Sequence, residues 1–142
     1  MKIQRTVETT AAPAAVFAYL SDFSNTTEWD PGTITTERVS GDGGVGTVYK
    51  NVSEFNGKRS ELRYEVVDVV PERRFALQGE GKAVHADDTM EFSATPTGTR
   101  VTYTADVRFK GALKVAEPLL GKAFKKLGDE AEAGMREALA KL

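Results

Sequence analysis

The 142-residue sequence contains no cysteine and only one histidine. Without cysteine there is no disulfide framework, no thiolate nucleophile and no zinc site built on thiolates. No apolar run approaches the length that a membrane-spanning helix needs, and the first residues lack the pattern of a signal peptide. We therefore expect a cytoplasmic protein with no stable membrane insertion.

An excess of charge of one sign is also missing. Nineteen basic and 21 acidic side chains give a net charge of −2. A nucleic-acid partner usually requires a basic stripe, which is absent, so we expect none. A content of 40% hydrophobic and 28% charged residues is typical of a globular domain. With no internal repeat or linker, residues 1–142 are expected to form one domain, as a monomer or a weak homodimer.

Over most of the sequence, apolar and polar residues alternate in the way that is typical of strands. A helix is expected to begin at Pro13, because proline suits a first helical turn. Only a short second helical turn is expected before the turn at Trp29-Asp30-Pro31-Gly32. Strands are predicted over residues 3–9, 34–39, 46–55, 58–70, 73–78, 84–94 and 99–109.

Two turns predict how the strands pair. Asn56-Gly57 is the strongest two-residue hairpin signal. It pairs Tyr49 with Tyr64, and Asn51 with Leu62, on one face of the sheet. The other face is charged and must meet solvent, so the first face covers the core. The turn over residues 95–98 likewise pairs the following inner-face residues: Ala86 with Val107, Asp88 with Ala105, Met90 with Tyr103, and Phe92 with Val101.

Residues 111–142 predict one long amphipathic helix. Apolar residues recur at helical spacing, and the charged residues lie mostly elsewhere around the helix. Pro118 predicts a kink after a first turn over residues 112–117, because proline cannot sit in a regular helix interior without cost. We expect an α+β fold: a curved antiparallel sheet of about seven strands around this long C-terminal helix, with two short helices after the first strand. Small residues on the inner stripe, such as Ala131, leave room for a cavity.

Three stretches carry a family resemblance. They are residues 12–32 (APAAVFAYLSDFSNTTEWDPG), 44–75 (GVGTVYKNVSEFNGKRSELRYEVVDVVPERRF) and 97–122 (TGTRVTYTADVRFKGALKVAEPLLGK). Together with the element order they resemble the START-type helix-grip superfamily, and more narrowly its polyketide cyclase/dehydrase and lipid-transport (SRPBCC) branch. The resemblance implies a helix-grip fold that encloses an apolar ligand. It brings no universal catalytic motif, so the catalytic residues stay unknown.

The predicted cavity lies between the sheet and the C-terminal helix. Trp29 is expected at one mouth of it, either as a ligand contact or as a packing anchor. No metal site and no cofactor are expected. The residues predicted to bind the ligand are Trp29, Tyr49, Asn51, Leu62, Tyr64, Phe75, Asp88, Met90, Phe92, Tyr103, Leu120, Phe124 and Leu127.

Few of the inward residues are polar. Asp88, if buried without a partner, would have a raised pKa and act as an acid or base. We favour instead a bulge or strand end where it reaches water, since unpaired aspartate is rarely buried. His85 falls on the polar face, as a surface histidine. For Tyr49, Tyr64 and Tyr103, ligand orientation and plain core packing both stay open.

Two functions remain open. The first is a binding module for a small hydrophobic ligand: a lipid, polyketide, steroid or aromatic molecule. The second is a polyketide cyclase/dehydrase-like enzyme in which a tyrosine or aspartate moves a proton. Residues 111–120 and the glycine-rich loop over residues 41–46 are the segments expected to open and close the cavity.

Overall fold

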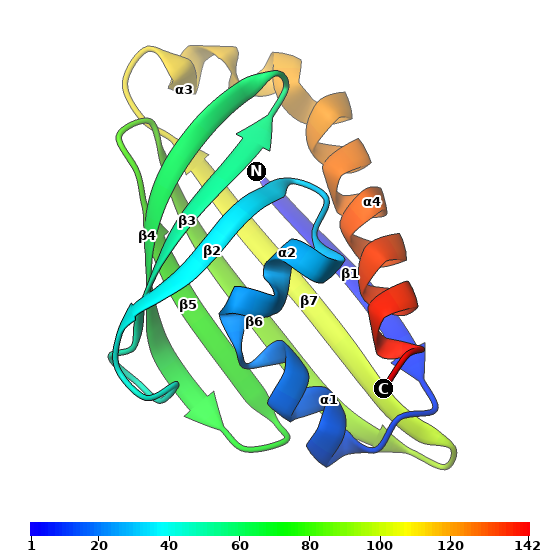
Figure 1. Cartoon of the computed structure of the whole chain (residues 1–142). Coiled ribbons are helices and arrows are strands. Elements are labelled where there is room, and N and C mark those ends of the chain that lie inside the picture. Colours follow the sequence, from blue (N-terminus) through cyan, green and yellow to red (C-terminus); the bar gives the residue numbers. More distant parts are fainter.

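Seven antiparallel strands form one sheet in the order β1-β7-β6-β5-β4-β3-β2. The computed structural model describes residues 1–142, and Figure 1 shows the sheet bent around the helices. Every predicted strand is present, with ends within two residues of those expected. The strands are β1 (Lys2–Thr9), β2 (Thr33–Ser40), β3 (Val48–Phe55), β4 (Lys58–Val70), β5 (Arg74–Glu80), β6 (Val84–Thr95) and β7 (Gly98–Phe109).

Both predicted hairpin registers are confirmed. In the β3–β4 turn, Asn56 and Gly57 have φ angles of 51° and 79°, the left-handed conformations that a two-residue turn of this kind requires. The same side chains therefore share a face as the sequence predicted. The paired residues include Tyr49 and Tyr64, Asn51 and Leu62, Asp88 and Ala105, and Met90 and Tyr103.

The helices lie at the two ends and along one side of the sheet. The first two segments after β1 are α1 (Pro13–Leu20) and a 3-10 turn, η1 (Phe23–Asn25), followed by α2 (Thr26–Trp29). The C-terminal region divides into α3 (Leu113–Ala116), η2 (Glu117–Leu120) and α4 (Gly121–Leu139). Because Pro118 lies in the 3-10 segment, the predicted break in the long helix is confirmed. The predicted α+β fold is confirmed as well.

Two glycines let α4 approach its neighbours closely. A Cβ atom added at Gly134 would lie 2.0 Å from the backbone oxygen of Trp29, and one at Gly128 would lie 2.9 Å from Cδ1 of Ile3. Any larger residue at Gly134 would force α4 away from α2. The inner face of α4 buries Phe124, Gly128, Ala131, Met135 and Leu139.

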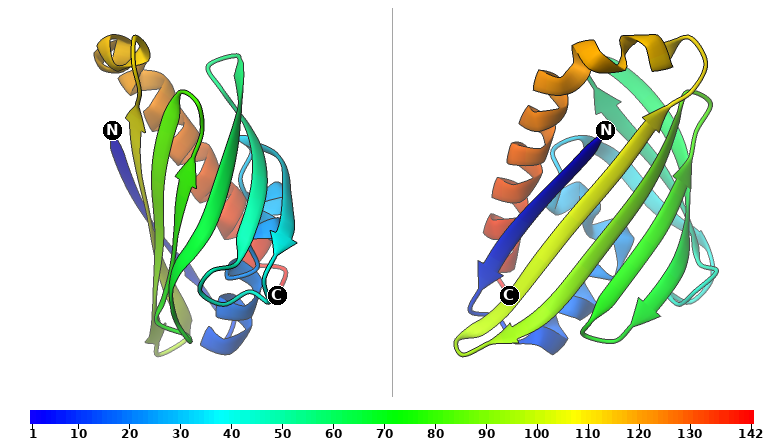
Figure 2. Two further views of the ribbon diagram at one scale, coloured as in Figure 1. Left: turned by 90° about the vertical axis from the view of Figure 1, so that its left-hand side faces the viewer. Right: turned by 180° about the vertical axis from the view of Figure 1, so that it is seen from behind.

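The end of the sheet next to α1 holds densely packed side chains. Phe17 from α1 meets Phe92 from β6 edge to face, with ring centroids 5.1 Å apart. Phe75 and Met90 are completely buried beside them. Figure 2 shows α1 at this end of the sheet and α3 at the opposite end. No helix of the protein is both long enough and apolar enough to cross a membrane.

Candidate functional site

A cavity of about 550 Å³ lies between the sheet and the C-terminal helical region. Its wall contains 30 residues, of which 20 are hydrophobic, so a ligand inside it would contact mainly apolar side chains. The strand residues in the wall alternate, as side chains on one face of a sheet must. On β6, for example, the wall contains Val84, Ala86 and Asp88, whereas Met90 is outside it.

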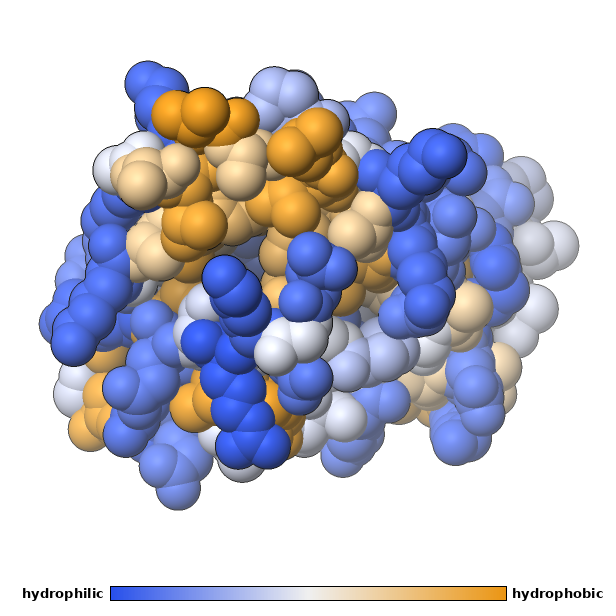
Figure 3. All heavy atoms as spheres, turned by 90° about the horizontal axis from the view of Figure 1, so that it is seen from above, coloured by the Kyte–Doolittle hydropathy of each residue, from blue (hydrophilic) through white to orange (hydrophobic).

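The mouth of the cavity lies between the β3–β4 hairpin and residues 111–120, which we call the lid. Leu113 and Leu119 of the lid line the cavity together with Phe55 of the hairpin. Figure 3, viewed onto this end, shows a hollow bordered by apolar residues. Leu119 is 86% exposed and Val115 is 83% exposed, so the lid carries apolar side chains that nothing in the protein covers.

The lid has few anchors, one of which is the ion pair of Glu117 with the N-terminal amine of Met1 at 3.1 Å. Neither of its two short helical segments, α3 and η2, contains a buried residue. Gly111, where the lid begins, has a φ of 59°, a conformation that glycine adopts without strain. By contrast, residues 41–46 contribute nothing to the cavity wall and lie at the other end of β3 from the mouth (Figure 1). Of the two segments expected to act as gates, only the lid borders the cavity.

The deep end of the cavity contains a buried carboxyl group. Asp88 is only 5% exposed, and the hydroxyl of Tyr103 donates a hydrogen bond of 3.0 Å to its Oδ2 atom. Burial raises the pKa of Asp88 to about 7, and the bond from Tyr103 offsets only part of that rise. The favoured prediction, that Asp88 reaches water, is therefore wrong. The β6–β7 pairing runs through Asp88 without a bulge, so the side chain stays on the inner face.

Two further polar side chains lie at the deep end. The Nε1 atom of Trp29 is buried and has no hydrogen-bond partner, and its ring meets that of Tyr103 edge to face at a centroid distance of 5.5 Å. Trp29 thus lies at the deep end and not at the mouth where it was expected. Tyr64 is 7% exposed, and burial raises the pKa of its hydroxyl far above the usual value.

Other polar groups in the wall are already satisfied within the protein. The Nδ2 atom of Asn51 donates to Thr36 Oγ1 at 2.9 Å, and Oδ1 of Asn51 accepts from Ser53 Oγ at 2.6 Å. The carboxylate of Asp30 accepts from the backbone nitrogen of Gly32 and from the Thr33 hydroxyl. Burial nevertheless raises the pKa of Asp30, because it outweighs those hydrogen bonds.

Four of the predicted ligand-binding residues are outside the cavity wall. They pack instead in the core at the α1 end, where Phe17 and Phe23 fill the space that the sequence left open. These four residues are Tyr49, Phe75, Met90 and Phe92, with exposed fractions of 1%, 0%, 0% and 6%. The nine predicted residues that do line the cavity are Trp29, Asn51, Leu62, Tyr64, Asp88, Tyr103, Leu120, Phe124 and Leu127.

Sequence reasoning also missed part of the wall. The predicted register places Ala105 and Val107 on the inner face of the sheet. On that ground both could have been predicted to bind the ligand. Phe23 and Asp30 lie in the irregular segment between α1 and β2, where no periodicity shows which side chains turn inward. All four of these residues line the cavity.

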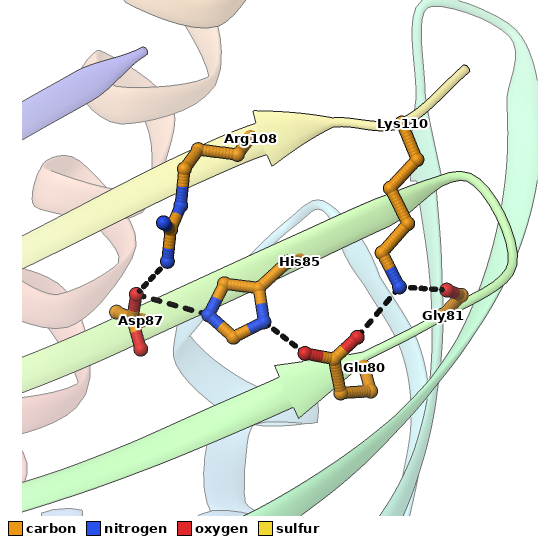
Figure 4. Close-up of polar contacts among 6 residues, drawn as sticks. All are labelled: Glu80, Gly81, His85, Asp87, Arg108 and Lys110. Carbon is orange, nitrogen blue, oxygen red and sulfur yellow. Dashed lines mark hydrogen bonds and ion pairs between the residues drawn. The ribbon is translucent and has the colours of Figure 1, made fainter.

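The only histidine lies outside the cavity. Figure 4 shows His85 on the outer face of the sheet, within a chain of charged residues from β5, β6, β7 and the residue that follows β7. Its Nδ1 atom contacts Glu80, and its Nε2 atom lies 3.0 Å from Asp87. Arg108 and Lys110 complete the chain through Asp87 and Glu80. The prediction that His85 belongs to the surface is confirmed.

A second depression, of about 850 Å³, is lined mainly by residues of β3, β4 and the turn between β5 and β6. Nine of its 15 wall residues are polar or glycine and only six are hydrophobic. It is wider but less enclosed and contains no buried acid, so we place the candidate site in the inner cavity. No group of three or more acidic or histidine side chains is arranged to hold a metal ion.

A curved antiparallel sheet closed by a C-terminal helix over an apolar cavity defines a helix-grip protein. The chain belongs to the polyketide cyclase/dehydrase and lipid transport family, which it matches over residues 1–142. No curated protein matches the sequence.

Solved structures share the fold at low sequence identity. The ZhuI aromatase/cyclase from Streptomyces sp. R1128 has a TM-score of 0.82 and 15% identity, covering 98% of this chain and 93% of its own. The protein TTHA0849 from Thermus thermophilus has a TM-score of 0.79 and 20% identity, with coverages of 98% and 95%. A START superfamily protein from Mycobacterium smegmatis has a TM-score of 0.80 and 14% identity, with coverages of 97% and 96%.

Proposed function

We propose that the protein binds a small, largely apolar molecule, such as a lipid, polyketide, steroid or aromatic compound, in the cavity between the sheet and α4. The observation that carries this proposal is the cavity itself. Its volume of about 550 Å³ is within the range of roughly 300–1,000 Å³ typical of small-molecule sites. Its wall combines many apolar residues with a few polar ones, which is the composition that such sites have.

The lid supports the same proposal, because an enclosed cavity needs a way in. Its segments contain no fully buried residue, and Leu113, Ala116 and Leu120 are only half-buried against the cavity. Segments that open easily are those with few buried contacts. Ligand entry beneath the lid would then leave the sheet and α4 unchanged.

Binding is tested first on the protein as purified. Native mass spectrometry would reveal a co-purifying small molecule, and thermal unfolding with fatty acids, sterols and flavonoids would reveal binding as a rise in Tm. Ala105→Phe places a large side chain in the cavity and should abolish the rise, whereas Ala94→Phe on the same sheet is exposed and should preserve it. If no compound binds and no molecule co-purifies, the proposal is wrong.

A second candidate function is supported by Asp88. A carboxyl group with a pKa of about 7 is suited to both donating and accepting a proton near neutral pH. In a cyclase/dehydrase-like reaction, Asp88 would remove a proton from a carbon beside a ketone, and the water-excluding cavity would hold the reacting chain folded. Incubation with a reactive poly-β-ketone mimic tests this. Wild type should form cyclised product faster than Asp88→Asn, and equal rates would exclude the reaction.

A further inference from the structure

The deep end of the cavity offers hydrogen-bonding capacity that the protein does not use. The indole N–H of Trp29 has no acceptor. Asp88 accepts from Tyr103 through Oδ2, and its Oδ1 atom has no hydrogen-bond partner in the protein. The hydroxyl of Tyr64 likewise makes no hydrogen bond within the protein. Because fully buried polar groups are nearly always paired, the unpaired indole N–H points to a ligand that supplies an acceptor. Asp88 and Tyr64 line the same cavity and have hydrogen-bonding capacity left for such a ligand.

The charge around these groups restricts the ligand further. The cavity wall contains two carboxyl groups, Asp30 and Asp88, and only two basic side chains, Lys58 and Arg59. Both basic residues directly follow the β3–β4 turn at the mouth. No cation therefore reaches the deep end. A carboxylate or phosphate there would be buried beside acids without a counter-charge, which is strongly unfavourable.

A positively charged group fits the deep end no better. An ammonium group only donates hydrogen bonds, so it would satisfy Asp88 but leave the indole N–H of Trp29 unpaired. A hydroxyl group both donates and accepts. It is the simplest neutral group that can form hydrogen bonds with an unused donor and an unused acceptor at the same time.

We propose that the ligand enters with an uncharged hydroxyl-bearing end first, accepting from Trp29 and donating to Asp88 at the deep end. This inference rests on the proposed binding function. The ligand class is thus a neutral hydroxylated ring compound or polyketide, and not a fatty acid bound by its carboxylate. An amphipathic anion would keep its charged head at the mouth, beside Lys58 and Arg59, and place only its tail inside.

The test compares four probes that share one apolar skeleton: naphthalene, 2-naphthol, 2-naphthoate and 2-naphthylmethylammonium. Dissociation constants are measured by calorimetry at pH 7. Trp29 is the only tryptophan, so its indole N–H gives a single NMR cross-peak that reports the deep end directly. We expect 2-naphthol to bind at least about tenfold more tightly than the other three, which is the worth of one buried hydrogen bond, and to move the indole peak.

Variants identify the partners. Asp88→Leu should remove the preference for 2-naphthol over naphthalene. Tyr64→Phe should reduce it, and the matched control Tyr19→Phe should not, because the Tyr19 hydroxyl binds Glu28 on the surface. If Asp88→Leu does not fold, the wild-type probe comparison and the two tyrosine variants still decide the matter.

The possible outcomes separate the two proposals. If 2-naphthoate or the ammonium probe binds as tightly as 2-naphthol and moves the indole peak, the hydroxyl assignment is overturned while the binding function stands. The same holds if 2-naphthol binds without moving the indole peak. If none of the probes binds, naphthalene included, and no molecule co-purifies, the binding function fails and this inference falls with it.

Discussion

The buried carboxyl of Asp88 predicts an unusual dependence of stability on pH. Its pKa rises from 3.8 in a solvated chain to about 7 in the folded protein. The folded state therefore holds its proton more firmly than the unfolded state. Stability from this group is complete below about pH 4 and is lost as pH rises to about 7. A shift of about 3 pKa units corresponds to about 4 kcal/mol of unfolding free energy.

Asp88→Asn removes this titration while nearly preserving the shape of the side chain. The variant loses or gains some stability at every pH through its altered bond to Tyr103, but that offset is constant. The difference in unfolding free energy, variant minus wild type, should therefore rise by about 4 kcal/mol between pH 4 and pH 8. Urea denaturation followed by circular dichroism at half-unit pH steps measures it.

The matched control is Asp106→Asn, which removes a carboxyl group from the outer face of the same sheet. It controls for the change from a carboxyl to an amide group at a position outside the cavity. The reasoning is refuted if the Asp88→Asn difference changes by less than about 1 kcal/mol over the full range, because Asp88 would then be solvated. An NMR titration of the Asp88 side-chain carbonyl carbon provides an independent value.

Three other predictions concern packing and the surface. Gly134→Ala should lower the unfolding free energy by about 2 kcal/mol or more, because its Cβ would meet a backbone oxygen at 2.0 Å; Gly121→Ala, with open space around it, should be neutral or slightly stabilising. Met90→Ala should lower the unfolding free energy by about 2–5 kcal/mol without changing ligand affinity. Leu120→Ala should weaken ligand binding and change the unfolding free energy little. The opposite pattern would contradict the assigned cavity wall. His85→Ala should alter stability by less than about 1 kcal/mol and leave ligand binding unchanged, and a loss of binding would show that the outer face participates.

The prediction for Asp88 was wrong for an instructive reason. Its position on the inner face followed correctly from the turn over residues 95–98. Because aspartate is rarely buried, however, we predicted that its side chain reaches solvent. The sequence could not show that Tyr103 would supply a hydrogen bond at 3.0 Å. That pairing joins residues 15 positions apart and depends on side-chain geometry, so burial became tolerable through a tertiary contact.

The cavity wall shows the same division. Leu62 and Tyr64 were identified from hairpin register, and both line the cavity. Phe75 and Met90 share their face of the sheet but lie beyond the end of the cavity. What separates the two groups is the reach of aromatic side chains from α1 and η1, which fill one end of the curved sheet. No pattern along the strands carries that information.

The sequence alone determined the strands, the two hairpin registers, the broken C-terminal helix and the face of the sheet that turns inward. These features depend on local turn chemistry and on the alternation of side chains, so they can be recognised within a few neighbouring residues. Only the tertiary structure decided where the core stops and the cavity begins, that Trp29 and Asp88 share its deep end, and how closely α4 approaches α2 at Gly134. Those outcomes depend on the volumes of side chains from distant segments that meet only after folding.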